Sequence, residues 1–466
     1  MPLESEKDTT ISHALKEAIS EFQESRLGVY KASPDQIKRD TNAAERATRD
    51  HVGRWLFELL QNSDDARATE AQIRVENNNV YFADNGDGLK PQAVRAICGT
   101  DFSDKTGGTI GRKGVGFKAI YEISSNPQVL VVGEGGVKFS RPDTEAWMLK
   151  NNLDCTYIPY QWIPFFVPWD SAVQDDDALR AFGDFRTVVV LRDVAVEQQN
   201  KVTQLLKQWP PHALFTFRHL RKITTSGGRE IILASNHDNW ELNDSQSKKT
   251  KWKVMKWTEP APQEMLQNLG HDEKGAIQND GVSFLVAAPL GEDRILPTDD
   301  YWPIHVFYPT EEKGPVRLLL HAEFLVKSDR TALVPIEESP FNTWVSERLA
   351  SHVSSFVNDA FQTENPSSHM ALLMPFADKE SHESANILWQ RIAENAKKHL
   401  LLADIHSERR LALDKALLLS ESTCPYLARR ILEATDDGTY LLHRSYDDDK
   451  EAQKALDAFS EQWQQE

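Results

Sequence analysis

Glu58–Ala66, with the sequence ELLQNSDDA, is the stretch that decides the fold of this chain. On a helix, Glu58, Asn62 and Asp65 stand at positions i, i+4 and i+7, so two carboxylates and a carboxamide share one face. Such a face can hold a metal ion and a water molecule. Taken alone, the spacing is more typical of the solvated face of a surface helix, and the neighbouring motifs reverse that preference.

The first neighbouring motif is Asp84–Gly88, with the sequence DNGDG. It follows a predicted strand, so Asp84 is expected at a strand end, where its carboxylate can accept a hydrogen bond from an exocyclic amine such as adenine N6. Gly86 and Gly88 allow the backbone to pass close beneath a flat base. By itself a D-x-G-x-G sequence is more often a hairpin turn.

The second motif is Ile110–Phe117, with the sequence IGRKGVGF. Its glycines precede a predicted helix, so their amides can point at an anion, and the helix dipole adds to the attraction. Lys113 and Lys118 supply neutralising charge. The motif is not a Walker A loop, because the glycine-lysine-serine/threonine ending is absent.

Together these motifs describe a nucleotide site. Asn62 offers a neutral oxygen ligand for Mg²⁺, an ion that keeps several waters and binds nucleotide phosphates. Glu58, one turn earlier on the same face, is placed to take a proton from an attacking water. The sequence therefore predicts a nucleotide and Mg²⁺ as ligands of this site.

The order of the motifs, completed by Thr187 on a late strand, resembles the four boxes of the GHKL ATPases (gyrase, Hsp90, histidine kinase and MutL). The sequences of Glu58–Ala66 and Ile110–Ala119 are most similar to those of the Hsp90-like ATP-binding domains of the sacsin and NO VEIN type and their bacterial relatives. The similarity extends over roughly residues 35–362.

The resemblance implies a Bergerat-type α/β sandwich, with a mixed sheet on one side, helices on the other, and ATP under a lid. It assigns Glu58 as general base, Asn62 as the Mg²⁺ ligand and Asp84 as the adenine reader. Asp65 would support the pocket, and Thr187 would reach the water network around Asp84, although Arg186 stands where the family usually has glycine. The other implied cofactor contacts are Ala66, Gly86, Gly88, Lys105, Gly111, Lys113, Gly114, Val115, Gly116, Phe117 and Lys118.

Two basic residues are candidates for the γ-phosphate. In Hsp90-like proteins an arginine of the following domain reaches that phosphate when the domains close, and Arg330 matches its position best, with Lys327 as the second choice. Arg330 would stabilise the transferring phosphoryl group. A structural ion pair of Arg330 with Asp329 or Glu323 is an equally good interpretation.

The length of 466 residues indicates more than one domain. We expect an N-terminal helical extension over residues 1–45, the ATP-binding domain over 46–230, a middle or transducer-like α/β domain over 231–362, and a helical C-terminal region over 363–466. Residues 143–177 are predicted to form an irregular insertion, and residues 214–223 a helix. The basic, aromatic stretch at residues 248–257 is interpreted as an edge strand with outward lysines rather than a nucleic-acid site.

Composition limits the function classes. A net charge of −18 gives no support to nucleic-acid binding over the whole surface. Three widely spaced cysteines without a C-x-x-C pair argue against a disulfide framework or a structural zinc. No apolar run approaches the roughly 18 residues of a membrane helix, and the N-terminus lacks a secretory h-region, so a cytoplasmic location is expected.

Two functions fit these features. The first is an Mg-dependent, ATP-hydrolysing conformational switch, chaperone-like or part of a bacterial defence system, which acts on an unknown protein partner and forms a homodimer on binding nucleotide. The second is an ATP-gated binding or scaffold module without turnover. A histidine kinase is disfavoured, because no helix with a phosphoacceptor histidine precedes Asn62.

Overall fold

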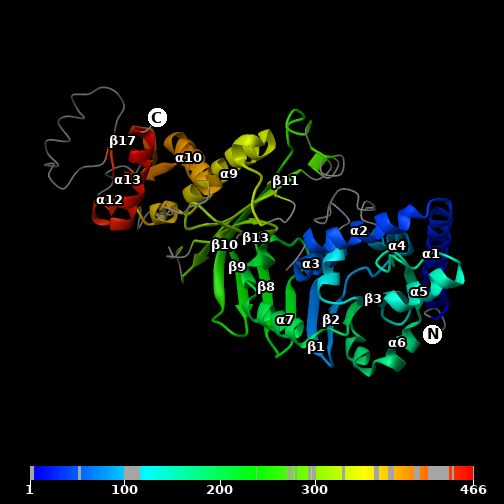
Figure 1. The fold of residues 1–466 in the computed structure, drawn as a ribbon. Coiled ribbons are helices and arrows are strands. Elements are labelled where there is room, and N and C mark those ends of the chain that lie inside the picture. Colours follow the sequence, from blue (N-terminus) through cyan, green and yellow to red (C-terminus); the bar gives the residue numbers. More distant parts are fainter. Residues whose placement is uncertain are drawn as a thin grey trace. The chain divides into compact units, whose positions relative to one another are not determined.

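The computed structural model describes residues 5–50, 54–98, 116–237, 239–267, 269–270, 274, 277–278, 281–291, 295, 301–327, 331–361, 367–375, 383–403, 410–417, 440–442 and 445–464. The chain divides into two compact units (Figure 1). The first contains Met1–Leu233, Asn243–Lys248 and Gly270–Asn279, and the second contains Ala234–Leu242, Lys249–Leu269 and Asp280–Glu466. The four domain boundaries given above stay predictions.

The first unit opens with two helices, α1 (Ser5–Ala32) and α2 (Asp35–Asp50), as the apolar periodicity predicts. Tyr30 at the end of α1 donates a hydrogen bond to Asp40 of α2 over 2.9 Å. Both helices contribute to a core cluster with α5 (Arg141–Lys150) and the segment that follows it. The N-terminal helices therefore pack on the unit that carries the predicted nucleotide motifs.

The sheet of the first unit has the strand order β8-β7-β1-β2-β6-β3-β4-β5. It is mixed, because β1 pairs with β7 in parallel while the other neighbours with given registers are antiparallel. The bounds are β1 Glu70–Glu76, β2 Asn79–Asp84, β3 Asn126–Val131, β4 Gly135–Phe139, β5 Pro164–Val167, β6 Thr187–Arg192, β7 Lys222–Thr225 and β8 Glu230–Asn236. Strands β1 and β2 form an antiparallel hairpin. It turns through Asn77 and Asn78 at φ of 51° and 62°, a conformation that asparagine tolerates better than most residues.

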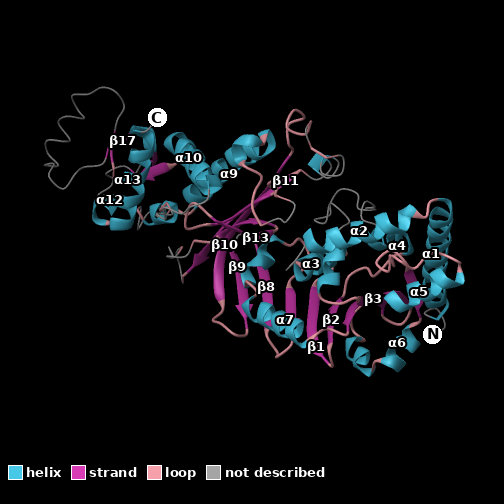
Figure 2. Ribbon diagram, in the orientation of Figure 1, coloured by secondary structure: helices cyan, strands magenta, loops and turns pink. Residues whose placement is uncertain are grey.

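Helices cover both faces of this sheet. Leu56 and Leu60 of α3 (Trp55–Asp65) lie near Ile73 on one face, together with α7 (Val196–Gln208), and Figure 2 shows α3 next to β1 and β2. On the opposite face, Tyr81 and Leu130 pack against α6 (Trp169–Asp175) and the 3₁₀ turn Asp177–Phe182. The expectation of helices on one side alone is therefore incomplete.

The segment 143–177 corrects a sequence expectation. Instead of an irregular insertion, it continues α5, supplies the edge strand β5, and then forms α6. Ser140 caps α5 by accepting a hydrogen bond from the Asp143 amide at 3.3 Å, with a proline in the first turn. Among the aromatic residues that suggest irregularity, Trp162 is buried in a core cluster, and Trp147, Tyr160 and Phe165 pack against that cluster.

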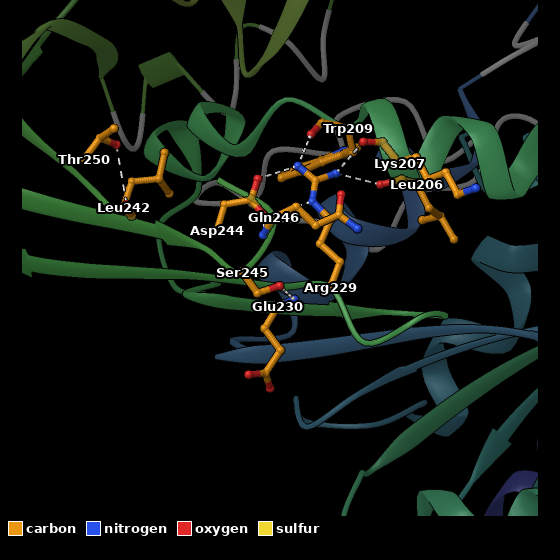
Figure 3. A network of polar contacts seen from close by, with 10 residues as sticks. All are labelled: Leu206, Lys207, Trp209, Arg229, Glu230, Leu242, Asp244, Ser245, Gln246 and Thr250. Atoms are coloured by element: carbon orange, nitrogen blue, oxygen red, sulfur yellow. Dashed lines mark hydrogen bonds and ion pairs between the residues drawn. The ribbon is translucent and has the colours of Figure 1, made fainter. Parts of the chain in front are cut away.

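Residues 214–223 are likewise not a helix. A 3₁₀ turn, Pro211–Thr216, is followed by an irregular stretch and then by β7. Its neighbour Arg229 is buried and bonds Asp244 through two nitrogens at 3.1 and 2.8 Å. The same guanidinium donates to the carbonyls of Leu206, Lys207 and Trp209, which end α7 (Figure 3). Arg229 thus donates hydrogen bonds to carbonyls at the end of α7 that have no partner within the helix.

The second unit carries a sheet of order β9-β10-β11-β14-β12-β13. The bounds are β9 Asn239–Asp244, β10 Thr250–Glu259, β11 Val282–Leu290, β12 Pro303–Val306, β13 Tyr308–Lys313 and β14 Leu319–Ala322. The prediction of a strand over 248–257 is confirmed, and Trp252 and Val254 are buried. The edge position is wrong, because β10 pairs with β9 on one side and β11 on the other.

Helices dominate the described C-terminal part. α9 (Pro340–Asp359), capped by Ser339, packs with α10 (Glu383–His399), and α12 (Ser445–Asp448) and α13 (Lys450–Gln464) follow. Within the predicted helical region, short strands also occur: β16 (Arg410–Ala412) pairs with β15 (Leu401–Ala403), and β17 (Ala416–Leu417) pairs with β18 (Tyr440–Leu441). Among the described residues, none of the helices combines the length and apolar character of a membrane span.

Candidate functional site

Helix α3 carries the predicted metal-and-water face. Its apolar residues Trp55, Leu56, Leu59 and Leu60 are buried, which fixes the helix against the core. Glu58 is only 3% exposed, and the Nε atom of Arg54 lies 4.0 Å from its Oε1 atom. Asn62 and Asp65 are half-buried on the same face. The face is therefore not the solvated side of a surface helix, which was the alternative interpretation of its spacing.

Asp84 lies at the end of β2, where its carboxylate is held by three hydrogen-bond donors. Ser63 of α3 donates from Oγ to Oδ2 at 3.0 Å, and the Gly86 amide donates to Oδ1 at 2.9 Å. The hydroxyl of Thr187 also bonds this carboxylate. Burial raises the pKa of Asp84, and the three hydrogen bonds oppose that shift. The result is an oriented acceptor at one edge of the sheet.

The loop after Asp84 runs against the end of α3. The Asp87 amide donates to the carbonyl of Ala66 at 2.8 Å, and a Cβ atom on Gly86 would stand 2.7 Å from that carbonyl oxygen. Gly88 has a φ of +83°, a region that side chains disfavour. Both glycines are thus required by this path of the chain, whichever ligand the loop receives.

Asp64 is a buried residue of α3 whose role the sequence does not reveal. Its carboxylate accepts hydrogen bonds from the amides of Arg218, His219 and Leu220 at 3.0, 2.7 and 2.8 Å. It therefore fixes α3 to the segment that leads into β7. The two adjacent aspartates of the motif differ in function, because Asp64 is engaged with backbone and Asp65 lies on the Glu58–Asn62 face.

Arg186 replaces the family's glycine, and it lies across the Asp84 loop. Its Nε and Cγ atoms would stand 3.2 and 3.3 Å from a Cβ atom on Gly88. Its Nη2 atom donates to Oε1 of Glu134, a buried residue of the β3–β4 turn, at 2.5 Å. Its amide donates to the carbonyl of Asp84 at 2.8 Å. The Arg186–Glu134 ion pair borders the candidate base site, and sequence reasoning did not anticipate it.

The end of the glycine motif enters a 3₁₀ helix, η2 (Gly116–Glu122). Phe117 is buried and packs on Phe139 with a ring-centroid distance of 6.3 Å. Lys118 is fully buried, and its ammonium donates to the carbonyls of Cys98 and Gln161. This placement corrects the expectation that Lys118 neutralises phosphate charge, because the ammonium is enclosed among protein groups.

Several predicted residues lie outside the described part of the chain. They are Lys105, Gly111, Lys113, Gly114, Val115 and Arg330. Lys327 is described, exposed, and belongs to the second unit, where its amide donates to the carbonyl of Ala332 at 3.0 Å. The assignments of Arg330 and Lys327 to the γ-phosphate stay predictions.

Residues 52–161 match the family of histidine kinase-, DNA gyrase B- and HSP90-like ATPases. This part of the chain belongs to the GHKL ATPase superfamily. The match contains α3 with Glu58 and Asn62, the Asp84 loop and the whole glycine motif, whereas Thr187 falls beyond it. The prediction of the superfamily and of an α/β fold is therefore confirmed.

Other similarities are more limited. Protein NO VEIN of Arabidopsis thaliana is 32% identical over 82 residues, which is 16% of this chain and 3% of that protein. The crystal structure of the N-terminal domain of a DNA repair protein covers 69% of this chain and 98% of its own, with 11% identity and a TM-score of 0.33. The GHKL assignment rests on the family match and on the local similarity to NO VEIN.

The donor chemistry of the GHKL motif fits a nucleotide-bound Mg²⁺. Asn62 presents an amide oxygen one turn from Glu58 on a half-buried face, and Mg²⁺ in nucleotide sites takes few protein ligands beside phosphates and waters. Over the described residues, no group of three or more His, Cys, Asp and Glu side chains is gathered as a metal site.

Proposed function

We propose that this protein binds Mg²⁺·ATP in the first unit, hydrolyses it, and uses the cycle as a conformational switch of the sacsin/Hsp90-like type. One observation carries the proposal. The buried Glu58 and the half-buried Asn62 share a face of α3, and the same helix, through Ser63, holds the Asp84 carboxylate at the sheet edge. The proposed water-activating group therefore stands on α3, and the proposed base-reading group at the end of β2 is bonded to the same helix.

Binding of the base would centre on Asp84. Its carboxylate, oriented by Ser63, the Gly86 amide and Thr187, accepts a hydrogen bond from the exocyclic amine of adenine. Gly86 and Gly88 have no side chains, so the backbone of the loop can lie close to the adenine ring. Guanine presents an oxygen at the corresponding position, so a carboxylate there disfavours GTP.

Hydrolysis would depend on Glu58 and Asn62. Asn62 would hold Mg²⁺ through its amide oxygen, and the ion would neutralise phosphate charge when bound. Glu58 accepts a proton from the attacking water as that water approaches the γ-phosphorus. Burial of Glu58 limits its exchange with bulk water and fixes its position relative to Asn62. Arg330, or alternatively Lys327, would stabilise the transferring phosphoryl group.

The conformational change driven by ATP binding and hydrolysis would act on a partner protein. We propose that closure on ATP brings two copies of the chain together and changes the surface offered to a protein client, in a chaperone-like or bacterial defence role in the cytoplasm. Such coupling requires that ATP bind the closed state more tightly than the open one. Nucleic acid is not proposed as a ligand.

The test is a comparison of phosphate release and ATP affinity in the full chain and two variants. Glu58→Ala should abolish release and keep binding, whereas Asn62→Ala should weaken Mg²⁺-dependent binding. Glu197→Ala, an exposed glutamate in the first turn of α7, serves as the matched control and should behave as wild type. A wild type that binds ATP but releases no phosphate would establish the second candidate, an ATP-gated module without turnover.

A further inference from the structure

Lys118 is a fully buried lysine that takes no part in the ATP chemistry proposed above. Its Nζ atom lies 2.8 Å from the carbonyl oxygen of Cys98 and 2.5 Å from that of Gln161. The rings of Tyr121, Phe139 and Trp162 surround it, with centroids 5.5, 5.7 and 6.0 Å from Nζ. The ammonium is therefore enclosed by two carbonyls and three aromatic faces.

This arrangement is costly for a lysine. Burial lowers the pKa of Lys118 to about 8, because an enclosed ammonium loses its hydration. Apolar residues of similar volume fill such positions without that penalty, and replacing buried charges by them is often neutral or stabilising. A role in holding particular backbone groups together accounts for the charge better than fold stability does.

The Cys98 carbonyl and Lys118 belong to different elements of the first unit. Cys98 is the last residue of α4 (Val94–Cys98) and the last described residue before 99–115, whereas Gly116 begins η2 directly after that stretch. The bond from Lys118 to Cys98 therefore joins η2 to the end of α4. Gly116 and Phe117, the last two residues of the glycine motif, belong to η2.

The same cluster reaches the N-terminal helices. The Trp162 indole, beside the Lys118 ammonium, donates to the carbonyl of Asp40 in α2 at 3.0 Å. The Arg26 guanidinium of α1 lies over the Trp162 ring, 4.2 Å from its centroid. The Thr48 hydroxyl of α2 donates to the carbonyl of Lys118 itself at 3.4 Å. Helices α1 and α2 are thus bonded to the residues that fix Lys118.

We propose that Lys118 is a positioning residue for the nucleotide reaction, which clamps Cys98 to η2 and couples both to helices α1 and α2. The inference rests on the proposed function for its effect on ATP. Lys118 does not contact the nucleotide. By fixing η2 against the end of α4, it holds Gly116 and Phe117, two of the proposed nucleotide contacts, in place, so that less entropy is lost when the nucleotide binds. Changes in α1 or α2 would reach the site through Trp162 and Lys118.

The experiment compares Lys118→Met with wild type by amide hydrogen exchange and by ATP titration of the full chain. In Lys118→Met we expect the amide exchange rates of residues 94–98 and 116–122 to be about tenfold higher than in wild type, while the rates in the β1–β2 hairpin stay the same. We expect ATP affinity to fall about tenfold while Glu58-dependent turnover at saturating ATP changes less than threefold. Lys201→Met, an exposed lysine of α7, is the control and should change neither quantity.

The outcomes separate the two proposals. If wild type does not bind ATP, the proposed function fails, and local exchange still decides whether Lys118 clamps Cys98 to η2. If Lys118→Met folds and leaves both the local exchange and the ATP affinity within twofold of wild type, the positioning role is overturned. Lys118→Gln, which keeps an amide donor, provides the same measurements if the methionine variant does not fold.

Discussion

Asp84 and Thr187 face each other across the antiparallel β2–β6 pair, at the residue where β2 ends and β6 begins. The Thr187 hydroxyl bonds the Asp84 carboxylate, and both side chains point to the face of the sheet that α3 covers, because Ser63 of α3 reaches the same carboxylate. The strand register therefore sets the orientation of the base-reading group. Several consequences can be measured.

Asp84→Asn should separate nucleotide binding from stability. Burial raises the pKa of Asp84, so the folded state favours the protonated carboxyl, and the stability from this group is present below the unfolded pKa and lost as pH rises through the folded pKa. Asparagine does not ionise and escapes that loss. We expect an unfolding temperature at pH 7 no lower than that of wild type, with the ATP-induced rise abolished. A variant that still gained stability from ATP would contradict the assignment of Asp84.

Gly86→Ala should disable the loop without unfolding the protein. Its Cβ atom would stand 2.7 Å from the carbonyl oxygen of Ala66, which the Asp87 amide already engages, so the loop must shift away from α3. We expect at least a tenfold loss of ATP affinity by titration and about 1–3 kcal/mol of destabilisation. Gly183→Ala is the control, because its Cβ atom would meet the carbonyl oxygen of Arg180 at an ordinary 3.6 Å. Equal effects of the two changes would argue against a special loop path.

Most of the candidate site could be predicted from residue type and spacing. Glu58, Asn62 and Asp84 are polar residues at helical or strand-end positions whose periodicity is local, and the structure brings α3 and Asp84 together through Ser63. The β1–β2 hairpin is predictable for the same reason, because consecutive asparagines between two apolar segments are typical of a tight turn.

The remaining contacts depend on tertiary packing and could not be predicted. Lys118 belongs to a glycine-rich segment, and only the folded structure shows that its ammonium is buried and bonded to the Cys98 carbonyl. The pairing of Arg186 with Glu134 joins residues 52 positions apart in the sequence. The error over residues 143–177 has a similar cause, because short elements held by aromatic packing carry little periodicity of their own.

The Arg186–Glu134 ion pair should show strong coupling in a double-mutant cycle. Removing Arg186 alone leaves a buried carboxylate without its cation, so Arg186→Gly should destabilise by about 2 kcal/mol, less than a fully enclosed pair because Arg186 is partly exposed. Adding Glu134→Gln should recover at least half of that loss. Denaturant unfolding of the four proteins measures the coupling, and additive effects would exclude it.

Arg229 should be among the most costly residues to remove. Burial opposes ionisation of Asp244, but its bonds with Arg229 outweigh that effect, and the pKa of Asp244 lies below its ordinary value. Arg229→Ala would leave this buried carboxylate without its cation and three carbonyls at the end of α7 without their guanidinium donor, with an expected loss of about 3–5 kcal/mol in urea unfolding. Lys222→Ala, at a half-exposed ion pair, is the control and should cost less than about 1 kcal/mol. A loss at Arg229 no larger than at Lys222 would contradict this account.

The buried Lys118 should also leave a pH signature in stability. Its folded pKa of about 8 lies below the ordinary value of 10.5, so between these values the unfolded chain binds a proton that the folded chain does not, and stability from this group rises with pH across that window. The titratable groups that face it from the packed elements are Arg26, Asp40, Cys98 and Tyr121. Burial raises the pKa of Cys98 to about 12 and that of Tyr121 well above its usual value, so neither thiol nor phenol ionises in the folded protein within the window. The stability of wild type minus that of Lys118→Met should therefore increase from pH 8 to pH 10 in urea unfolding. A difference that stays constant or falls over this range would mean that the ammonium of Lys118 is not held in the enclosed position between Cys98 and Gln161.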